Sequence, residues 1–246
     1  ATSDPVVGLY HAGWTGIAVE LEARFCPVLA SVVHKQHTNV GVMCPVKATP
    51  ENTPRMLHDH NVAKDFAYLK IDIDSYDCDV LQAILADGFR PAVIQMETGA
   101  IPPPIKFNVQ YTPEYARPHA QIYQAFGCSL SYTNDLIARV AHDGGYKLIQ
   151  AGLDSIWIRG DVIARSPVHV WVQPDETTAF VNGFWRWPWR RELHIWEIGT
   201  EHWFQFQSDI PRLAAVQEHM RCVQDCFHEA DPGTGRAPSF LYTLSR

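Results

Sequence analysis

The sequence predicts an α/β fold with a mostly parallel sheet that ends in an antiparallel hairpin. From Gly16 to Arg159, short β-type runs alternate with amphipathic helical runs. The run from Ala67 to Ile73 is apolar enough to be buried on both faces, as the central strands of parallel sheets are. The last two strand patterns, 146–150 and 155–159, are joined by a short turn that contains glycine. With 246 residues, 46% of them apolar, the chain can form one such domain and an appendage.

Periodicity then predicts the individual elements. A polyproline run, Pro102 to Pro104, predicts a long loop over about 101–131. A helix capped by Ser75 or Asp77 is expected to end at Gly88, and another is expected to begin at Thr133 or Asn134. The other helical runs are 25–33 and 209–229, and the strands are 17–21, 40–45, 67–73, 92–96, 146–150 and 155–159.

A change in composition after Asp161 predicts two units. Residues 1–161 carry the alternating pattern, and residues 162–246 form an aromatic-rich extension that ends in a helix. The segment 180–206 holds five tryptophans and four phenylalanines, with several arginines among them. Tryptophan and arginine dominate interface hot spots, so this segment predicts a protein partner; packing within the chain is the alternative.

Composition also limits the partners. The formal net charge is −7, and the chain has no run rich in lysine and arginine, which argues against nucleic acid and anionic lipid as partners. No stretch of about 18 apolar residues is present, so no transmembrane helix is predicted. The chain starts with Ala1 rather than methionine and shows no signal pattern, which indicates processing, trimming or an incomplete record. Import into an organelle is one way to such a start, and the sequence leaves the compartment open.

The six cysteines contain no C-x-x-C pair and are too sparse for a disulfide scaffold. Reducing surroundings and free thiols are therefore expected. Cys222 and Cys226 share one helix face, which is compatible with a redox or metal role but more typical of buried thiols. The twelve histidines lack zinc-like spacing, so no metal site is predicted from them.

Carboxylates at the predicted strand ends are the candidate site. In open α/β sheets, ligands bind outside the carboxyl ends of the strands. Glu20, Asp72, Asp74 and Glu97 all lie at such ends. Glu20 is suited to accept hydrogen bonds from two ribose hydroxyls, and the four acids together are suited to a divalent metal or a general base. The alternative for Asp74 and Asp77 is that they only cap the following helix.

Several segments resemble the FkbM family of methyltransferases, in consistent order over about residues 4–161. The strand and turn from Phe66 to Asp77 resemble the family's Lys-Ile-Asp-x-(Asp/Glu)-Gly signature, with Ser75 where the family has glycine. The run from Gly13 to Glu20 resembles the strand that precedes it. Further matches are the segments 97–105, 126–130 and 145–159.

This resemblance implies a Rossmann-like class I methyltransferase sheet, S-adenosylmethionine as cofactor, and O-methylation of a sugar or small metabolite. Glu20 matches the acid that binds the cofactor's ribose. Asp72 matches the acid beside the transferring methyl group, where it orients a hydroxyl or accepts its proton. Lys70 and Glu97 lie close to it with less fixed roles. The family's first strand and glycine-rich turn are expected before Asp4, so the turn for the cofactor's methionine end is missing from this sequence.

Three hypotheses follow. The first is a small-molecule O-methyltransferase with Glu20, Lys70, Asp72 and Glu97 at its site. The second is a catalytically degenerate relative that docks into a larger complex through segment 180–206. The third is a binding or metal-dependent hydrolytic domain that uses the acidic strand ends.

Overall fold

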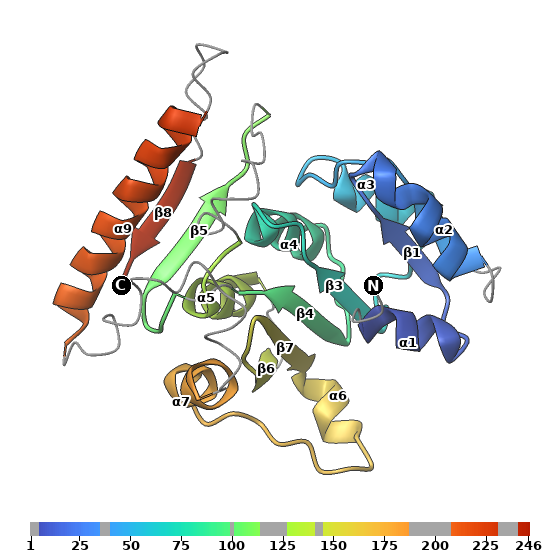
Figure 1. Ribbon diagram of the computed structural model, residues 1–246. Coiled ribbons are helices and arrows are strands. Elements are labelled where there is room, and N and C mark those ends of the chain that lie inside the picture. The colour runs from blue at the N-terminus through green and yellow to red at the C-terminus, as the bar shows by residue number, and fades with distance from the viewer. Residues whose placement is uncertain are drawn as a thin grey trace.

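The computed structural model has an α/β architecture with a mixed sheet, and it describes residues 5–34, 40–98, 101–113, 127–140, 145–186, 208–230 and 241–246 (Figure 1). Its strands are β1 (Gly16–Val19), β2 (Val40–Met43), β3 (Tyr68–Ile71), β4 (Val93–Glu97), β5 (Lys106–Gln110), β6 (Tyr146–Gln150), β7 (Asp154–Arg159) and β8 (Leu241–Ser245). Its helices are α1 (Pro5–His11), α2 (Cys26–His34), α3 (Thr53–Asp59), α4 (Asp77–Ala86), α5 (Leu130–Val140), α6 (Gly160–Arg165), α7 (Glu176–Phe180) and α9 (Asp209–Ala230), with the 3₁₀-helix η1 (Ala23–Phe25) and the π-helix η3 (Val181–Trp185).

The strands in the described part of the chain form three sheets. The largest has the order β3-β4-β7-β6, in which β3 and β4 are parallel and β7 is antiparallel to both of its neighbours. The strands β1 and β2 form a parallel pair, and β5 and β8 form an antiparallel pair. The predicted strands and the terminal hairpin are therefore confirmed, within a sheet that is divided rather than continuous.

The central position predicted for 67–73 is wrong. Among the described residues β3 is an edge strand of the four-stranded sheet, with β4 on one side only. Three of its four residues are half-buried, and only Ile71 is fully buried. Its apolar side chains fitted a doubly covered strand, but strand order is set by pairing between distant segments, which local composition does not encode.

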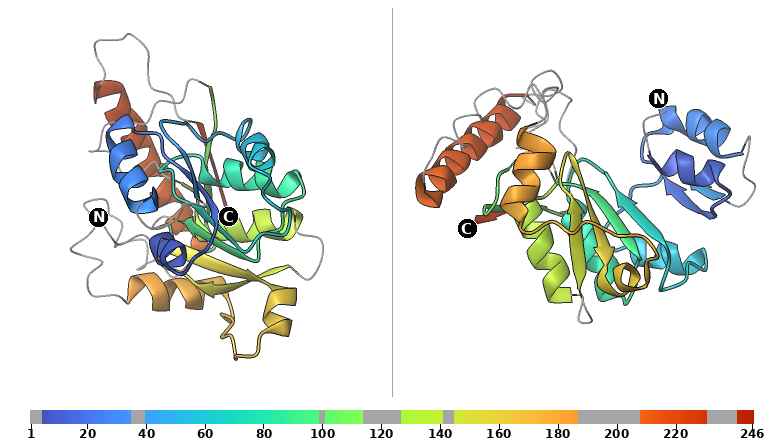
Figure 2. Two further views of the ribbon diagram at one scale, coloured as in Figure 1. Left: turned by 90° about the vertical axis from the view of Figure 1, so that its right-hand side faces the viewer. Right: turned by 90° about the horizontal axis from the view of Figure 1, so that it is seen from below.

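Among the residues that the structure describes, two separate cores reflect the divided sheet. The main core joins α4 and α5 to the four-stranded sheet, with Trp157 and Phe89 among its largest buried side chains. A smaller core of Tyr10, Val33 and Val40 holds the N-terminal elements α1, β1, α2 and β2 together. Figure 2 shows these N-terminal elements, coloured blue, as a lobe to one side of the remaining sheet.

The predicted loop over 101–131 contains a strand instead. β5 lies within it and pairs with β8, more than 130 residues later in the sequence, as the register Lys106↔Ser245 shows. The two strands lie far apart in the sequence, so the prolines at 102–104, from which a loop was predicted, could not indicate the pairing. The helix expected from Thr133 or Asn134 begins earlier, at Leu130. The hydroxyl oxygen of Ser129 accepts a hydrogen bond from the N–H of Tyr132, the capping interaction that starts this helix.

The described parts of 162–246 pack on the same core as the rest of the chain. Phe180, Phe184, Val216 and Met220 all belong to the main core. The tryptophans at 187, 189, 196 and 203 lie outside the described residues, as does the side chain of Trp185, so docking through 180–206 stays a prediction. None of the helices in the described part of the chain has the length and apolar character needed to span a bilayer.

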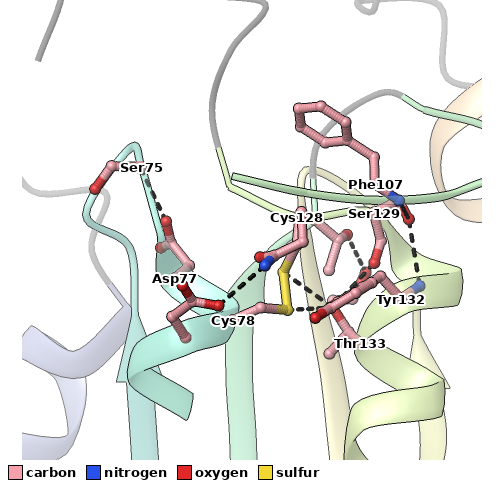
Figure 3. The surroundings of a disulfide bond; sticks show 12 residues. Ser75, Asp77, Cys78, Phe107, Cys128, Ser129, Tyr132 and Thr133 are labelled. Carbon is pink, nitrogen blue, oxygen red and sulfur yellow. Dashed lines mark hydrogen bonds between the residues drawn. A yellow bond between two sulfur atoms is a disulfide. The ribbon is translucent and has the colours of Figure 1, made fainter. Parts of the chain in front are cut away.

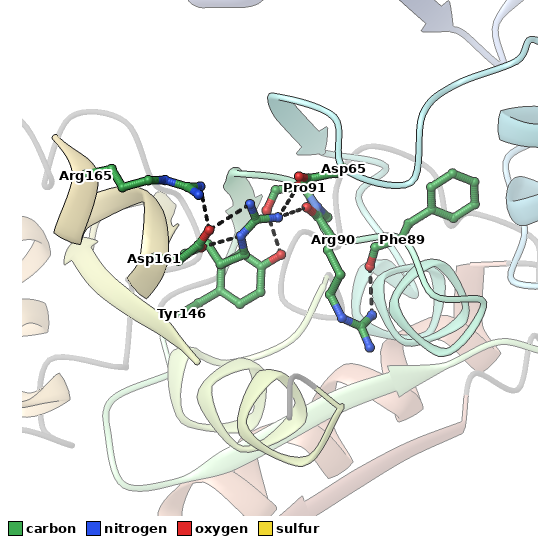
Figure 4. A network of polar contacts seen from close by, with 8 residues as sticks. Asp65, Phe89, Arg90, Pro91, Tyr146, Asp161 and Arg165 are labelled. Atoms are coloured by element: carbon green, nitrogen blue, oxygen red, sulfur yellow. Dashed lines mark hydrogen bonds and ion pairs between the residues drawn. The ribbon is translucent and has the colours of Figure 1, made fainter. Parts of the chain in front are cut away.

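The amino ends of β3 and β4 are fastened by paired charges (Figure 4). Arg159, the last residue of β7, donates hydrogen bonds to the carboxylates of Asp65 and Asp161. These bonds, that to Asp161 first, raise the pKa of Arg159. Beside it the hydroxyl of Tyr146 donates to the carbonyl oxygen of Pro91 at 2.6 Å. At this end of the sheet, two carboxylates therefore compensate the charge of Arg159.

Candidate functional site

A groove of about 1200 Å³ runs between the β1–β2 pair and the four-stranded sheet. It is lined by β1 on one side and β3 on the other, and within the described chain each of these strands is the edge of its own sheet. Glu20, directly after β1, lines the groove together with Lys70 and Asp72 at the end of β3. Ligand pockets commonly measure about 300–1,000 Å³, so this groove is large enough for a nucleoside-sized ligand.

Three of the predicted acids form a cluster at the carboxyl ends of β3 and β4. Each of Asp72, Asp74 and Glu97 has a carboxylate oxygen within 4.8 Å of one from each of the others. The parallel register explains the meeting: Ile71 lies opposite Met96, so the next residues, Asp72 and Glu97, leave the two strands side by side. Asp74 then turns back in the left-handed region, with φ 53°, a conformation that aspartate tolerates better than most residues.

Asp77 holds the turn that carries Asp74. Its carboxylate accepts hydrogen bonds from the N–H of Ile73 at 3.0 Å and of Ser75 at 2.9 Å. The predicted cap by Ser75 or Asp77 is therefore wrong: the N-cap of α4 is Tyr76, with no side-chain capping bond, and Asp77 binds the preceding loop instead. Because the left-handed residue is Asp74, position 75 does not require glycine. Burial raises the pKa of Asp77 to about 7, although the two backbone donors act in the opposite direction.

Glu97 is the least satisfied acid of the cluster. Burial, followed by the negative charges of Asp77, Asp72, Asp74 and Asp154, raises its pKa to about 9. Its Oε2 atom is buried without a hydrogen-bond partner. At neutral pH the Glu97 side chain is therefore a protonated acid that can donate a hydrogen bond to a neighbouring carboxylate or to a ligand.

The remaining predicted site residues, Lys70 and Glu20, lie in different places relative to the cluster. The ammonium group of Lys70 lies 3.0 Å from a carboxylate oxygen of Asp72. Glu20 lies across the groove, and its Oε1 atom accepts a hydrogen bond from the N–H of Glu22 at 2.7 Å. The structure thus brings Asp72, Asp74 and Glu97 together, ties Lys70 to Asp72, and leaves Glu20 on the opposite wall.

A buried polar chain beside the cluster was missed from the sequence. The side-chain amide of Gln95 donates to Asp154 at 2.5 Å, and its oxygen accepts from the hydroxyl of Tyr68. Asp154 lies opposite Glu97 in the ladder between β4 and β7. A glutamine inside an otherwise apolar strand was the available signal, because a buried amide needs partners.

The expectation of free thiols is wrong for four of the six cysteines. Cys78 and Cys128 form a disulfide that joins the first turn of α4 to the segment before α5 (Figure 3). Cys26 and Cys44 form a second one between the start of α2 and the loop after β2. The paired residues are 50 and 18 positions apart, so only the fold brings them together. The side chains of Cys222 and Cys226 lie outside the described residues.

The site therefore offers two kinds of binding chemistry. Asp72, Asp74 and Glu97 supply the hard carboxylate oxygens that Mg²⁺ and Ca²⁺ prefer. Glu20 and Asp72 supply acceptors on opposite walls of the groove for a polar ligand that lies across it. A protonated Glu97 beside the carboxyl groups of Asp72 and Asp74 supplies an acid and a base in one place.

Comparison of the chain with the models of known protein families, with curated proteins and with solved structures finds no match. The geometry of the site and the sequence resemblance are thus the grounds for assigning a function.

Proposed function

We propose that this chain is an S-adenosylmethionine-dependent O-methyltransferase with a Rossmann-like class I sheet. The FkbM-like segments and the antiparallel hairpin that ends the four-stranded sheet support this proposal. The observation that carries it is the position of Glu20 and Asp72 on opposite walls of one groove, at the carboxyl ends of β1 and β3. These are the two positions at which the resemblance expects the ribose and the transferring methyl group.

The residues present fit the ribose part of the cofactor. A ribose diol needs a carboxylate acceptor, and Glu20 has one oxygen engaged by the N–H of Glu22 and a second oxygen for the ligand. That backbone bond also fixes the orientation of the carboxylate. Asp72 is 39% exposed at its side chain, so a ligand in the groove can reach it despite its contact with Lys70.

The acid cluster suits the acceptor hydroxyl. S-adenosylmethionine supplies an electrophilic methyl group when bound. Asp72, paired with Lys70, orients the acceptor hydroxyl and takes up its proton. Glu97, protonated at neutral pH because of its raised pKa, donates a hydrogen bond and spares the site a further negative charge. Alignment of the two reactants in the groove then supplies much of the rate enhancement.

Calorimetric titration of the full-length protein with S-adenosylmethionine tests the proposal. Glu20→Gln removes a charge-assisted hydrogen bond worth about 1.5–3 kcal/mol, so we expect affinity to fall roughly 10- to 150-fold. The matched control is Glu22→Gln, because the Glu22 carboxylate pairs with Arg24 and its backbone N–H to Glu20 is retained. Absence of binding to the unmodified protein, or equal binding by Glu20→Gln, would refute the proposal.

The docking hypothesis stays a prediction beside it. Its support from sequence lies in segment 180–206, most of which is outside the described residues. The same titration separates the two, because a docking protein without enzymatic activity has no need to bind the cofactor.

A further inference from the structure

The two disulfides differ in their access to solvent. Cys78 and Cys128 are 0% and 1% exposed, and both sulfur atoms lie near the hydroxyl of Thr133, at 3.4 and 3.3 Å. Cys26 and Cys44 are only partly buried. Thiol–disulfide exchange requires a thiolate to reach one sulfur along the S–S axis, so access limits its rate.

The accessible disulfide is connected to Glu20 through short contacts. The sulfur atoms of Cys26 and Cys44 each lie 3.9 Å from the carbonyl oxygen of Glu22, whose N–H holds the Glu20 carboxylate. On the other side, the N–H of Val46, two residues after Cys44, donates to the carbonyl oxygen of Glu20 at 2.8 Å. Both halves of the disulfide thus border the loop that fixes Glu20 on the groove wall.

We propose that the Cys26–Cys44 disulfide is a redox-sensitive clasp that sets the position of Glu20 and thereby the ligand affinity of the groove. The identity of that ligand rests on the proposed function, whereas the clasp itself does not. When the disulfide is intact, the start of α2 is tied to the loop after β2, and Glu20 is held between them. When it is reduced, the loop between β1 and α2 is released.

The reductant is a dithiol. One of its thiolates attacks the sulfur of Cys44, the S–S bond breaks, and Cys26 leaves as a thiolate that is then protonated. The second thiol of the reductant resolves the mixed disulfide, so that the dithiol is oxidised to a disulfide and two cysteine thiols result. Cys26 is the first residue of α2, and the positive end of the helix dipole stabilises the leaving thiolate.

Exposure, rather than helix position, makes the two disulfides different. Cys78 also lies in the first turn of a helix, α4, but it is enclosed by the main core. Its reduction requires local opening of the structure, and the free energy of that opening slows the exchange. The Cys78–Cys128 disulfide is therefore an internal reference for the other.

Graded reduction of the full chain with dithiothreitol, followed by alkylation and mass spectrometry, tests the clasp. We expect Cys26 and Cys44 to become alkylated at least about tenfold faster than Cys78 and Cys128, since only the second pair must wait for local opening. Hydrogen exchange of residues 20–26 is expected to accelerate in the partly reduced protein and in the variant Cys26→Ser/Cys44→Ser. Equal alkylation rates, or unchanged exchange over 20–26 in both forms, would overturn the proposal.

Titration with S-adenosylmethionine then links the clasp to the groove. We expect the affinity to fall at least about tenfold in the partly reduced protein and in Cys26→Ser/Cys44→Ser, approaching the loss caused by Glu20→Gln. Adding dithiothreitol to Cys26→Ser/Cys44→Ser should cause no further loss. Unchanged affinity after selective reduction refutes control by the clasp. Absence of binding to the oxidised protein refutes the proposed function instead. In that case the hydrogen-exchange and alkylation measurements still test whether the disulfide holds the loop that carries Glu20.

Discussion

The two ends of the four-stranded sheet both carry ionisable side chains, but these side chains are arranged in opposite ways. At the amino ends of β3 and β4, Arg159 meets the carboxylates of Asp65 and Asp161, two partners of opposite charge. At the carboxyl ends, Asp77 and Glu97 are buried beside further acids, and their pKa values rise to about 7 and about 9. Burial beside other acids disfavours the ionised form of a carboxyl group, so ionisation of these groups lowers the stability of the fold. The amino end therefore relies on ion pairs, whereas the carboxyl end holds buried acids whose ionised forms are disfavoured.

The two ends are also held together by different means. The amino end relies on side-chain hydrogen bonds and ion pairs between β7 and its surroundings. The carboxyl end relies on backbone donors to Asp77 and on the covalent bond between Cys78 and Cys128. A crosslink does not depend on charge, so it can hold a site in which the charges repel one another.

The largest expected effect is removal of that crosslink. Cys78→Ser/Cys128→Ser opens a loop of 50 residues and is expected to lower the free energy of unfolding by about 4 kcal/mol, by the chain-entropy estimate. Denaturant unfolding in the absence of reductant measures it. Cys26→Ser/Cys44→Ser, with a loop of 18 residues, is expected to lose less, about 3 kcal/mol. A loss smaller than that of Cys26→Ser/Cys44→Ser would contradict the expected order of the two disulfides.

The pH dependence of stability is expected to distinguish the ends next. The pKa of Asp77 rises from its ordinary value of 3.8 to about 7 in the fold. A raised pKa means that the group's stabilising contribution is complete below its unfolded pKa and is lost as pH rises through the folded pKa. Between about pH 4 and pH 8, ionisation of Asp77 should therefore lower the free energy of unfolding of the unmodified protein by about 2–4 kcal/mol. The variant Asp77→Asn should not show this decrease. The measurement is the difference in unfolding free energy between variant and unmodified protein at both pH values.

The control for this dependence of the unfolding free energy on pH is Asp87→Asn. Hydrogen bonds from Lys64, then from His58, hold the pKa of the Asp87 carboxyl below its ordinary value. A lowered pKa gives a contribution that is present above the unfolded pKa and lost on acidification, so Asp87→Asn should lose stability relative to unmodified protein as pH rises. The two variants should therefore differ in the sign of their slopes. If the two variants gave slopes of the same sign, the expected difference between the buried acid Asp77 and the exposed, ion-paired acid Asp87 would be contradicted.

The smallest effect is expected at the amino end. Tyr146→Phe removes a buried hydroxyl and leaves the carbonyl oxygen of Pro91 without this donor, at a cost of about 1–2 kcal/mol. Burial raises the pKa of Tyr146 to about 12, so the side chain stays neutral and the loss should be constant from about pH 4 to pH 8. Thermal or denaturant unfolding at both pH values checks it. If the loss changed between about pH 4 and pH 8, ionisable groups at the amino end would also affect the free energy of unfolding in this pH range.

Much of the local structure could be predicted from residue patterns. Alternating apolar runs located all six predicted strands, and apolar periodicity located α2, α4, α5 and α9 to within a few residues. Gly88 was correctly predicted to end its helix, because it adopts φ 87°, a conformation that glycine enters without steric cost. The rule that ligands bind at the carboxyl ends of strands selected Asp72, Asp74 and Glu97 before any contact between them was known. These features depend on neighbours in sequence, and the sequence by itself therefore determined them.

Tertiary structure alone decided the features that join distant segments. Within the described ranges, it placed β3 at an edge, paired β5 with β8, and brought four cysteines into two disulfides. It also separated Glu20 from the other acids by a groove, and it turned Asp77 from an expected helix cap into the buried anchor of a loop. Each of these outcomes depends on which chain segments pack together. Pairing energy and desolvation act between residues that are neighbours only in space, so no local pattern contains them.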